Sequence, residues 1–150
     1  MKIYIETSVI SAYAFGPEAT KRLTRSFFGR VTRQRHELVT SGITIGEIMA
    51  SVRRVRGKLL KVVVKNKIRI WRTNEMVWTL AELYLKTGMI PSEFAADPEH
   101  IAAATQLGVD VLVSWNLRHI VNVRTKTMVK EINSKFGYKV PDIVRPDEVF

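Results

Sequence analysis

The stretch MKIYIETSV at residues 1–9 decides the fold of this chain. Ile3 and Ile5 alternate with more polar neighbours, a period that predicts a β-strand. Glu6 stands at the end of this strand, and the two residues that follow it are both favourable helix caps. A strand that leads directly into a helix is the opening of an α/β unit, and such units place their chemistry at the carboxyl ends of the strands.

The rest of the sequence alternates between strand and helix patterns. Further strands are predicted at 37–40, 67–71, 110–114 and 140–144. Helices are predicted at 8–15, 18–35, 43–52, 74–87, 97–108, 117–121 and 125–135. The segment 53–72 is strongly basic, with a buried side expected from Leu59, Leu60, Val62, Val63 and Val64. This alternation predicts a single α/β domain over residues 1–150, with one parallel sheet flanked by helices.

The composition is that of a globular protein, with 46% hydrophobic and 25% charged residues. The chain has no cysteine, which excludes a disulfide framework and a thiolate metal site and fits a reducing compartment. No apolar run approaches the length of a membrane span, and no signal peptide precedes the first strand. We therefore expect a soluble, cytoplasmic protein that does not contact a membrane.

Positive charge is concentrated in the first half of the chain. Residues 1–72 hold 16 basic and 4 acidic side chains, whereas residues 73–150 hold 8 and 10. This asymmetry favours a basic face for a polyanion such as nucleic acid, and the alternative is an ordinary solvated surface. The side chains that we expect to contact nucleic acid are Arg22, Arg25, Arg30, Arg33, Arg53, Arg54 and Arg118.

Four polar residues stand at or just beyond predicted strand ends: Glu6, Glu47, Asp97 and Asn116. If those strands are neighbours, the four side chains converge at the carboxyl edge of the sheet. Three carboxylates and an amide form an oxygen-rich site of the kind that suits Mg²⁺ or Mn²⁺. Such an ion can lower the pKa of a bound water and offset charge on a phosphodiester.

Each of these residues also has a purely structural interpretation. Glu47 fits a capping box with Thr44, and Asp97 and Asn116 are both favourable N-caps for the helices predicted after them. Glu6 fits an exposed acid at a strand end. His100 and His119 are excluded from the catalytic set, because a histidine beside a helix is more often a surface or hydrogen-bonded residue.

Taken together, four stretches resemble the PIN-domain nucleases, in particular the VapC-type toxin ribonucleases and their prokaryotic relatives. The stretches are YIETS at 4–8, TSGITIGE at 40–47, DPEHIAAA at 97–104 and DVLVSWNLRHIVN at 110–122. The resemblance implies a three-layer α/β/α sandwich around a mostly parallel sheet. It also implies an acidic cluster that holds one or two Mg²⁺ or Mn²⁺ ions and hydrolyses RNA.

The resemblance assigns a role to each of the four polar residues. Glu6, Glu47 and Asp97 take the positions of metal-binding acids, and Asn116 takes a fourth position that is usually acidic. Ser8 and Ser114 resemble hydroxyl residues that support the ligands. Two departures stand out: Glu6 replaces the commoner aspartate, and Asn116 removes one negative charge.

The expected function is therefore a Mg²⁺- or Mn²⁺-dependent endoribonuclease, the toxin of a toxin–antitoxin pair, with RNA and a small antitoxin protein as partners. The resemblance also implies a homodimer, to which apolar residues in 59–64 or 76–85 could contribute, and the alternative is that both stretches belong to the core of the chain itself. A catalytically inactive, PIN-like nucleic-acid-binding module is the alternative, because fold alone does not establish activity. Trp115 is expected to plug the sheet edge rather than to stack on a base.

Overall fold

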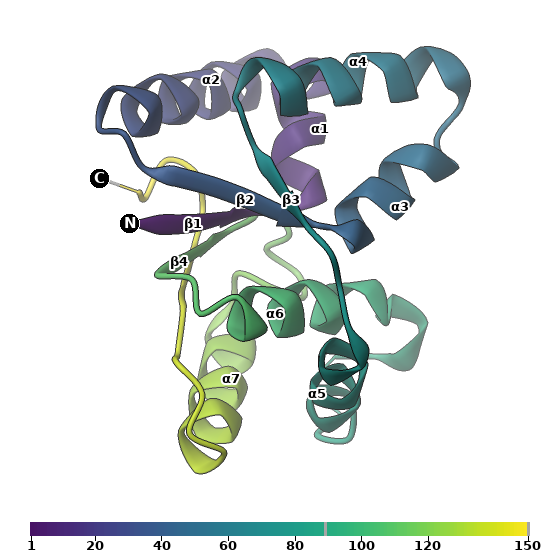
Figure 1. Cartoon of the computed structure of the whole chain (residues 1–150), viewed down its shortest axis with the longest axis vertical. Coiled ribbons are helices and arrows are strands. Elements are labelled where there is room, and N and C mark those ends of the chain that lie inside the picture. The colour runs from purple at the N-terminus through teal and green to yellow at the C-terminus, as the bar shows by residue number, and fades with distance from the viewer. Residues whose placement is uncertain (89, 150) are drawn as a thin grey trace.

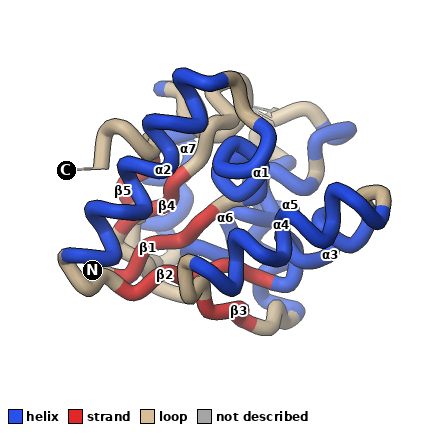
Figure 2. The backbone as a smooth tube through the Cα atoms, turned by 90° about the horizontal axis from the view of Figure 1, so that it is seen from above, coloured by secondary structure: helices blue, strands red, loops and turns tan. Residues whose placement is uncertain are grey.

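The computed structural model describes residues 1–88 and 90–149 and is built around one five-stranded sheet (Figure 1). The strands are β1 (Lys2–Ile5), β2 (Glu37–Ser41), β3 (Arg69–Trp71), β4 (Val111–Val113) and β5 (Asp142–Val144). They lie in the order β3-β2-β1-β4-β5, as Figure 2 shows, and every neighbouring pair is parallel. Each predicted strand is present, and the sheet is parallel throughout.

Helices cover both faces of this sheet and form the outer layers. They are α1 (Thr7–Phe15), α2 (Glu18–Arg33), α3 (Gly42–Ala50), α4 (Arg53–Lys65), α5 (Glu75–Leu85), the short 3₁₀ helix η1 (Ser92–Phe94), α6 (Ala96–Gln106) and α7 (Val123–Lys135). Helices α1, α2 and α4 lie on one face, and α5, α6 and α7 lie on the other (Figure 1). The expected three-layer α/β/α sandwich is therefore confirmed.

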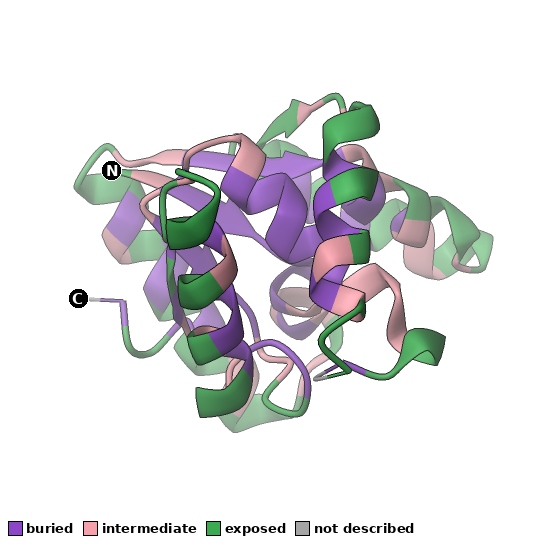
Figure 3. Cartoon of the chain, turned by 90° about the horizontal axis from the view of Figure 1, so that it is seen from below, coloured by how far each residue is buried: buried purple, intermediate pink, exposed green. Residues whose placement is uncertain are grey.

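Alternation along β1 explains why both layers pack on the sheet. Ile3 and Ile5 point toward the layer of α1, α2 and α4, where they pack with Phe27 and Phe28. Tyr4 points the opposite way and packs with the core of α5, α6 and α7. The central strands β1, β2 and β4 and the inner sides of the helices are accordingly buried (Figure 3), whereas the edge strand β3 is largely exposed. A strand buried on both faces is what a parallel sheet requires.

The strand order places a topological switch point between β1 and β4. From β1 the chain continues to β2 and β3 on one side, whereas β4 and β5 lie on the other side. In open parallel sheets, the crevice at the carboxyl ends of the two strands flanking such a point is the usual position of a functional site. Here those two ends are followed by Glu6 and Ser114.

Two features of the helices differ from the sequence-based prediction. The helix expected at 117–121 is only a turn, closed by hydrogen bonds from the amides of Ile120 and Val121 to the carbonyl of Asn116. Val64 was expected on the buried side of α4, but it is 77% exposed because it falls on the outer side of the helix, while Val62 and Val63 are buried.

Within the described ranges 1–88 and 90–149, no helix combines the length and the apolar character that crossing a membrane would require.

Candidate active site

Glu6 is fixed at the junction of β1 and α1. Its own amide continues the sheet by donating to the carbonyl of Val113, 3.1 Å away. Its Oε1 accepts from the amide of Ser8 at 3.1 Å, which makes Glu6 the N-cap of α1. Its Oε2 accepts from the hydroxyls of Ser8 and Ser114, the latter at 2.7 Å. Glu6 is only 5% exposed, so it is not the exposed strand-end acid of the structural interpretation.

Glu47 reaches the same edge from the middle of α3. Its Oε2 accepts hydrogen bonds from the hydroxyl of Thr7 and from Nε2 of His100, the latter at 2.9 Å. The capping-box interpretation is wrong, because the N-cap of α3 is Ser41, while Thr44 accepts from Thr40. Burial favours a raised pKa of Glu47, but the contacts with His100 and Thr7 outweigh it and lower that pKa.

His100 is the central residue of this group and is fully buried. Its Nε2 lies 2.9 Å from Oε2 of Glu47 and 3.9 Å from Oε1 of Glu6, while its Nδ1 lies 2.9 Å from the hydroxyl of Tyr4. Burial opposes a charged imidazole, but Tyr4 and the two carboxylates raise the pKa of His100 well above its ordinary value. Glu6, Glu47 and His100 bring one ligand atom each to within 4.8 Å of the others, and we name them the Glu6–Glu47–His100 cluster.

Asp97 forms a second group beside the first. It lies inside the first turn of α6, whose N-cap is Ala95, so the prediction that Asp97 is an N-cap is wrong. Its Oδ1 accepts from Nδ2 of Asn116 at 2.9 Å, and its Oδ2 lies 2.8 Å from Nδ1 of His119. Both oxygens of this carboxylate therefore have a side-chain partner. We name this group the Asp97–Asn116–His119 cluster.

The hydroxyl of Ser114 connects the two clusters. It donates to Oε2 of Glu6 at 2.7 Å and accepts from the amide of Asn116 at 2.9 Å. The hydroxyl of Ser8, which donates to Glu6, accepts from the amide of Trp115 at 2.9 Å. The serines thus lie where supporting residues were expected, and the clusters adjoin at the ends of β1 and β4. Asp97 nevertheless lies outside the group whose ligand atoms are within 4.8 Å of one another.

Asn116 and Trp115 lie at the site, and both also stabilise the surrounding structure through hydrogen bonds. Oδ1 of Asn116 accepts from the amide of His119 at 3.0 Å, so the residue caps a turn as well as contacting Asp97. Trp115 donates from Nε1 to the hydroxyl of Thr24 at 2.9 Å and packs on the apolar core beneath α2. The interpretation of Trp115 as a plug at the sheet edge is confirmed.

Sequence reasoning excluded the two histidines that the structure places in contact with the acids. For His100, a signal was available: it directly precedes the run Ile-Ala-Ala-Ala at 101–104, whose residues are all buried. A polar residue next to such a run requires a buried partner. For His119, no comparable signal existed, because its contact with Asp97 depends on the conformation of the turn after β4.

A surface groove lies beside the site and includes Glu47 among its lining residues. Its volume is about 480 Å³, and its lining residues are Gly42, Ile43, Gly46, Glu47, Ala50, Thr73, Trp78, Ala96 and Glu99. Trp78 is 43% exposed, so the groove presents an aromatic surface beside Glu47.

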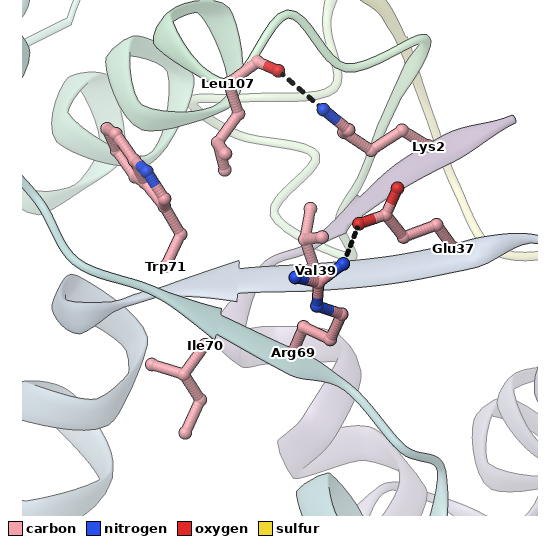
Figure 4. Close-up of a pocket in the computed structure, with 7 residues that line it drawn as sticks. All are labelled: Lys2, Glu37, Val39, Arg69, Ile70, Trp71 and Leu107. Atoms are coloured by element: carbon pink, nitrogen blue, oxygen red, sulfur yellow. Dashed lines mark hydrogen bonds and ion pairs between the residues drawn. The ribbon is translucent and has the colours of Figure 1, made fainter.

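Figure 4 shows a different cavity, of about 290 Å³, at the amino ends of the strands. Lys2, Glu37 and Arg69, which begin β1, β2 and β3, line it. Their charged groups already have partners, because Arg69 donates to Glu37 at 2.9 Å and Lys2 donates to the carbonyl of Leu107 at 3.2 Å. This cavity lies at the opposite end of the sheet from Glu6.

Most of the arginines expected to contact nucleic acid are exposed: Arg22, Arg25, Arg33, Arg53, Arg54 and Arg118. Arg30 is different. It is partly buried, and its guanidinium donates to the carbonyls of Pro146 and Val149 at 3.3 and 3.0 Å. Arg30 therefore holds the C-terminal segment against α2.

Comparison with known proteins supports this architecture at the level of fold. A scan of protein-family profiles and a search of curated proteins find no match. A chain in the crystal structure of VapBC2 from Rickettsia felis, bound to a DNA fragment from their promoter, is similar over 97% of both chains, with a TM-score of 0.56 and 14% identity. The chain has the fold of the VapC toxins.

A second VapC structure shows the same likeness over a shorter range. Mycobacterium tuberculosis VapC20, a Sarcin-Ricin loop cleaving toxin, is similar over 73% of this chain and 86% of its own, with a TM-score of 0.50 and 15% identity. The resemblance to VapC-type PIN domains inferred from four short motifs is therefore confirmed for the fold. Both acidic clusters lie at the carboxyl edge of this VapC-like sheet.

Proposed function

We propose that this chain is a metal-dependent endoribonuclease that hydrolyses phosphodiester bonds in RNA. The observation that carries the proposal is the Glu6–Glu47–His100 cluster, whose ligand atoms converge within 4.8 Å at the switch point of a VapC-like sheet. Its position beside an open groove supports a reaction on a polymer rather than on a small enclosed molecule.

The donor set of this cluster fits a divalent cation. Two carboxylates face one buried histidine, and carboxylate oxygens are the ligands that Mg²⁺ and Mn²⁺ favour. A phosphodiester is itself anionic, so it approaches two carboxylates favourably only with a cation between them. When bound, the cation would supply charge neutralisation and Lewis acidity at the scissile phosphate.

The chain's own residues would act by holding these ligands in place. Glu6 and Glu47 would bind the ion, with Ser8 and Ser114 fixing the direction of the Glu6 carboxylate. Asp97 would complete the site or orient the attacking water from the adjoining cluster. Asn116 would act through Asp97, since its amide group donates to that carboxylate.

The basic layer would bind the RNA backbone. Helices α2 and α4 carry exposed Arg22, Arg25, Arg33, Arg53 and Arg54, and Arg118 lies near the Asp97–Asn116–His119 cluster with its guanidinium 5.7 Å from the ring centre of Phe94. Such contacts give affinity without sequence information and make binding depend strongly on salt. A binding module without catalysis would use the same arginines, but it would have no use for carboxylates that repel its ligand.

The partners proposed for the chain follow from the VapC-like fold. One of the two similar structures is a VapBC complex, which supports a small antitoxin as the partner of this chain in the cytoplasm. For the homodimer, the exposed Val64 and half-exposed Leu60 of α4 offer an apolar surface, while the buried Leu59, Val62 and Val63 belong to the core. The toxin role, the antitoxin and the homodimer are all part of this proposal.

The test is cleavage of a single-stranded RNA by the purified protein. We expect cleavage with Mg²⁺ or Mn²⁺, none with a chelator, and recovery when the ion is restored. Glu6→Gln should be inactive, whereas Glu75→Gln, an exposed control on α5, should cleave at the wild-type rate. Cleavage that continues in chelator, or equal rates for wild type and Glu6→Gln, would contradict the proposal.

A further inference from the structure

The histidine of the first cluster carries an inference beyond the oxygen ligands considered so far. We propose that Nε2 of His100 is a direct ligand of the divalent cation and makes the site prefer Mn²⁺ to Mg²⁺. This inference rests on the metal site of the proposed function, but not on the reaction that occurs there.

The distances in the cluster fit a shared ion. Two ligands that each lie about 2.1 Å from an octahedral ion are about 3.0 Å apart when adjacent and about 4.2 Å apart when opposite. Nε2 of His100 lies 2.9 Å from Oε2 of Glu47 and 3.9 Å from Oε1 of Glu6. The three ligand atoms therefore need little movement to bind one ion.

The other ring nitrogen of His100 is held in the way that metal-binding histidines are held. Nδ1 lies 2.9 Å from the hydroxyl of Tyr4, and this hydroxyl lies 2.6 Å from Oγ of Ser41. In the metal-free chain, Nε2 of His100 donates to Glu47. If Nδ1 donates to Tyr4 and Tyr4 donates to Ser41, the bound cation takes the place of the Nε2 proton, and the lone pair of Nε2 then faces the ion. Such partners fix the tautomer and orientation of ligating histidines. Tyr4 lies two residues before Glu6, so β1 supplies both a carboxylate and the group that orients His100.

The nitrogen ligand decides which ion the site favours. Mg²⁺ prefers oxygen ligands and keeps several waters, so it gains little from an imidazole. First-row transition ions bind imidazole better, and Mn²⁺ combines this with a preference for carboxylates and water in octahedral geometry. A site of two carboxylates and one imidazole therefore favours Mn²⁺ over Mg²⁺.

Pulsed EPR of the Mn²⁺-bound full chain tests this directly, because it detects nitrogen bonded to manganese. The chain has three histidines, so the coupling can be assigned with His36→Gln, His100→Gln and His119→Gln. We expect coupling in the wild type, in His36→Gln and in His119→Gln, and its loss in His100→Gln together with at least about a tenfold loss of Mn²⁺ affinity. Mg²⁺ affinity should change much less, and Tyr4→Phe should weaken Mn²⁺ binding while the coupling remains.

The outcomes separate this inference from the proposed function. Bound Mn²⁺ without nitrogen coupling would overturn the role of His100 and leave the carboxylate site and the nuclease proposal standing. Coupling that disappears in His119→Gln instead would place the ion at the other cluster and equally overturn the inference. Absence of any Mn²⁺ binding would overturn both. If His100→Gln does not fold, coupling that persists in the other two variants assigns the nitrogen to His100 by elimination.

Discussion

The two clusters at the edge of the sheet share their chemistry but differ in the number of carboxylates. Helix α6 contributes to both, because Asp97 and His100 lie three residues apart on one side of it. In the Asp97–Asn116–His119 cluster, one carboxylate has two side-chain donors, one for each oxygen. In the Glu6–Glu47–His100 cluster, two carboxylates face a single histidine. In the Glu6–Glu47–His100 cluster the three ligand atoms also lie within 4.8 Å of one another, so a cation is expected there first.

The largest effect should come from removing a carboxylate of that cluster. Glu6→Gln keeps the size of the side chain but loses a charged ligand, so we expect cleavage to fall by about a thousandfold or more, equivalent to about 4 kcal/mol. Single-turnover cleavage at saturating Mn²⁺ measures this loss. A similar loss in the Glu75→Gln control would show that the effect does not belong to the cluster.

Asp97→Asn should have a smaller effect on cleavage and a clear effect on stability. The amide side chain introduced at position 97 is uncharged and has only one acceptor oxygen, so it cannot accept hydrogen bonds from both Asn116 and His119. The orientation of the side chain at position 97 should therefore change. We expect about a hundredfold slower cleavage and a melting temperature lower by a few degrees. Asp142→Asn, at an exposed position of β5, is the matched control for calorimetry and cleavage. A wild-type rate in Asp97→Asn would show that the second cluster is structural only.

The arginines should affect affinity rather than chemistry. In a Glu6→Gln background that does not cleave, replacing Arg22, Arg25 and Arg33 with Gln should weaken RNA binding about tenfold and reduce the slope of log affinity against log salt by about 2. Arg30→Gln is the control, because its guanidinium contacts Pro146 and Val149 instead. Fluorescence anisotropy over a salt series separates the two, and equal slopes for all variants would contradict an RNA-binding role for α2.

The smallest effect should be a dependence of stability on pH. Without metal, the folded state raises the pKa of His100 well above its ordinary value. This contribution to stability is complete below the unfolded pKa of about 6.5 and is lost as the pH rises through the folded pKa. In chelator, the melting temperature of the wild type and of His36→Gln should therefore fall as the pH rises from about 6.5 to the folded pKa of His100. The melting temperature of His100→Gln should not show this fall. An unchanged slope in His100→Gln would assign the dependence to another group.

The sequence predicted the clusters unequally, and the physical reasons are specific. Glu6 was predictable because a strand, an acid and a helix cap follow one another directly in β1 and α1. Asp97 was predicted at the same edge as a metal-binding acid, with a helix cap as the alternative. Its carboxylate instead contacts Asn116 and His119 on the turn after β4, which no local pattern reveals. His100 was excluded because a helix pattern alone does not show that its partners, Tyr4 and Glu47, come from two other elements. The fold was easier, since the alternation of strands and helices and four motifs all favoured the same parallel sheet.

The central claim is that a divalent cation binds between Glu6 and Glu47. The most direct test is a crystal of the metal-free protein soaked in Mn²⁺, with anomalous scattering used to place the ion. We predict a peak about 2.2 Å from a carboxylate oxygen of each residue. Crystals that take up Mn²⁺ with no peak between these two side chains would contradict the account.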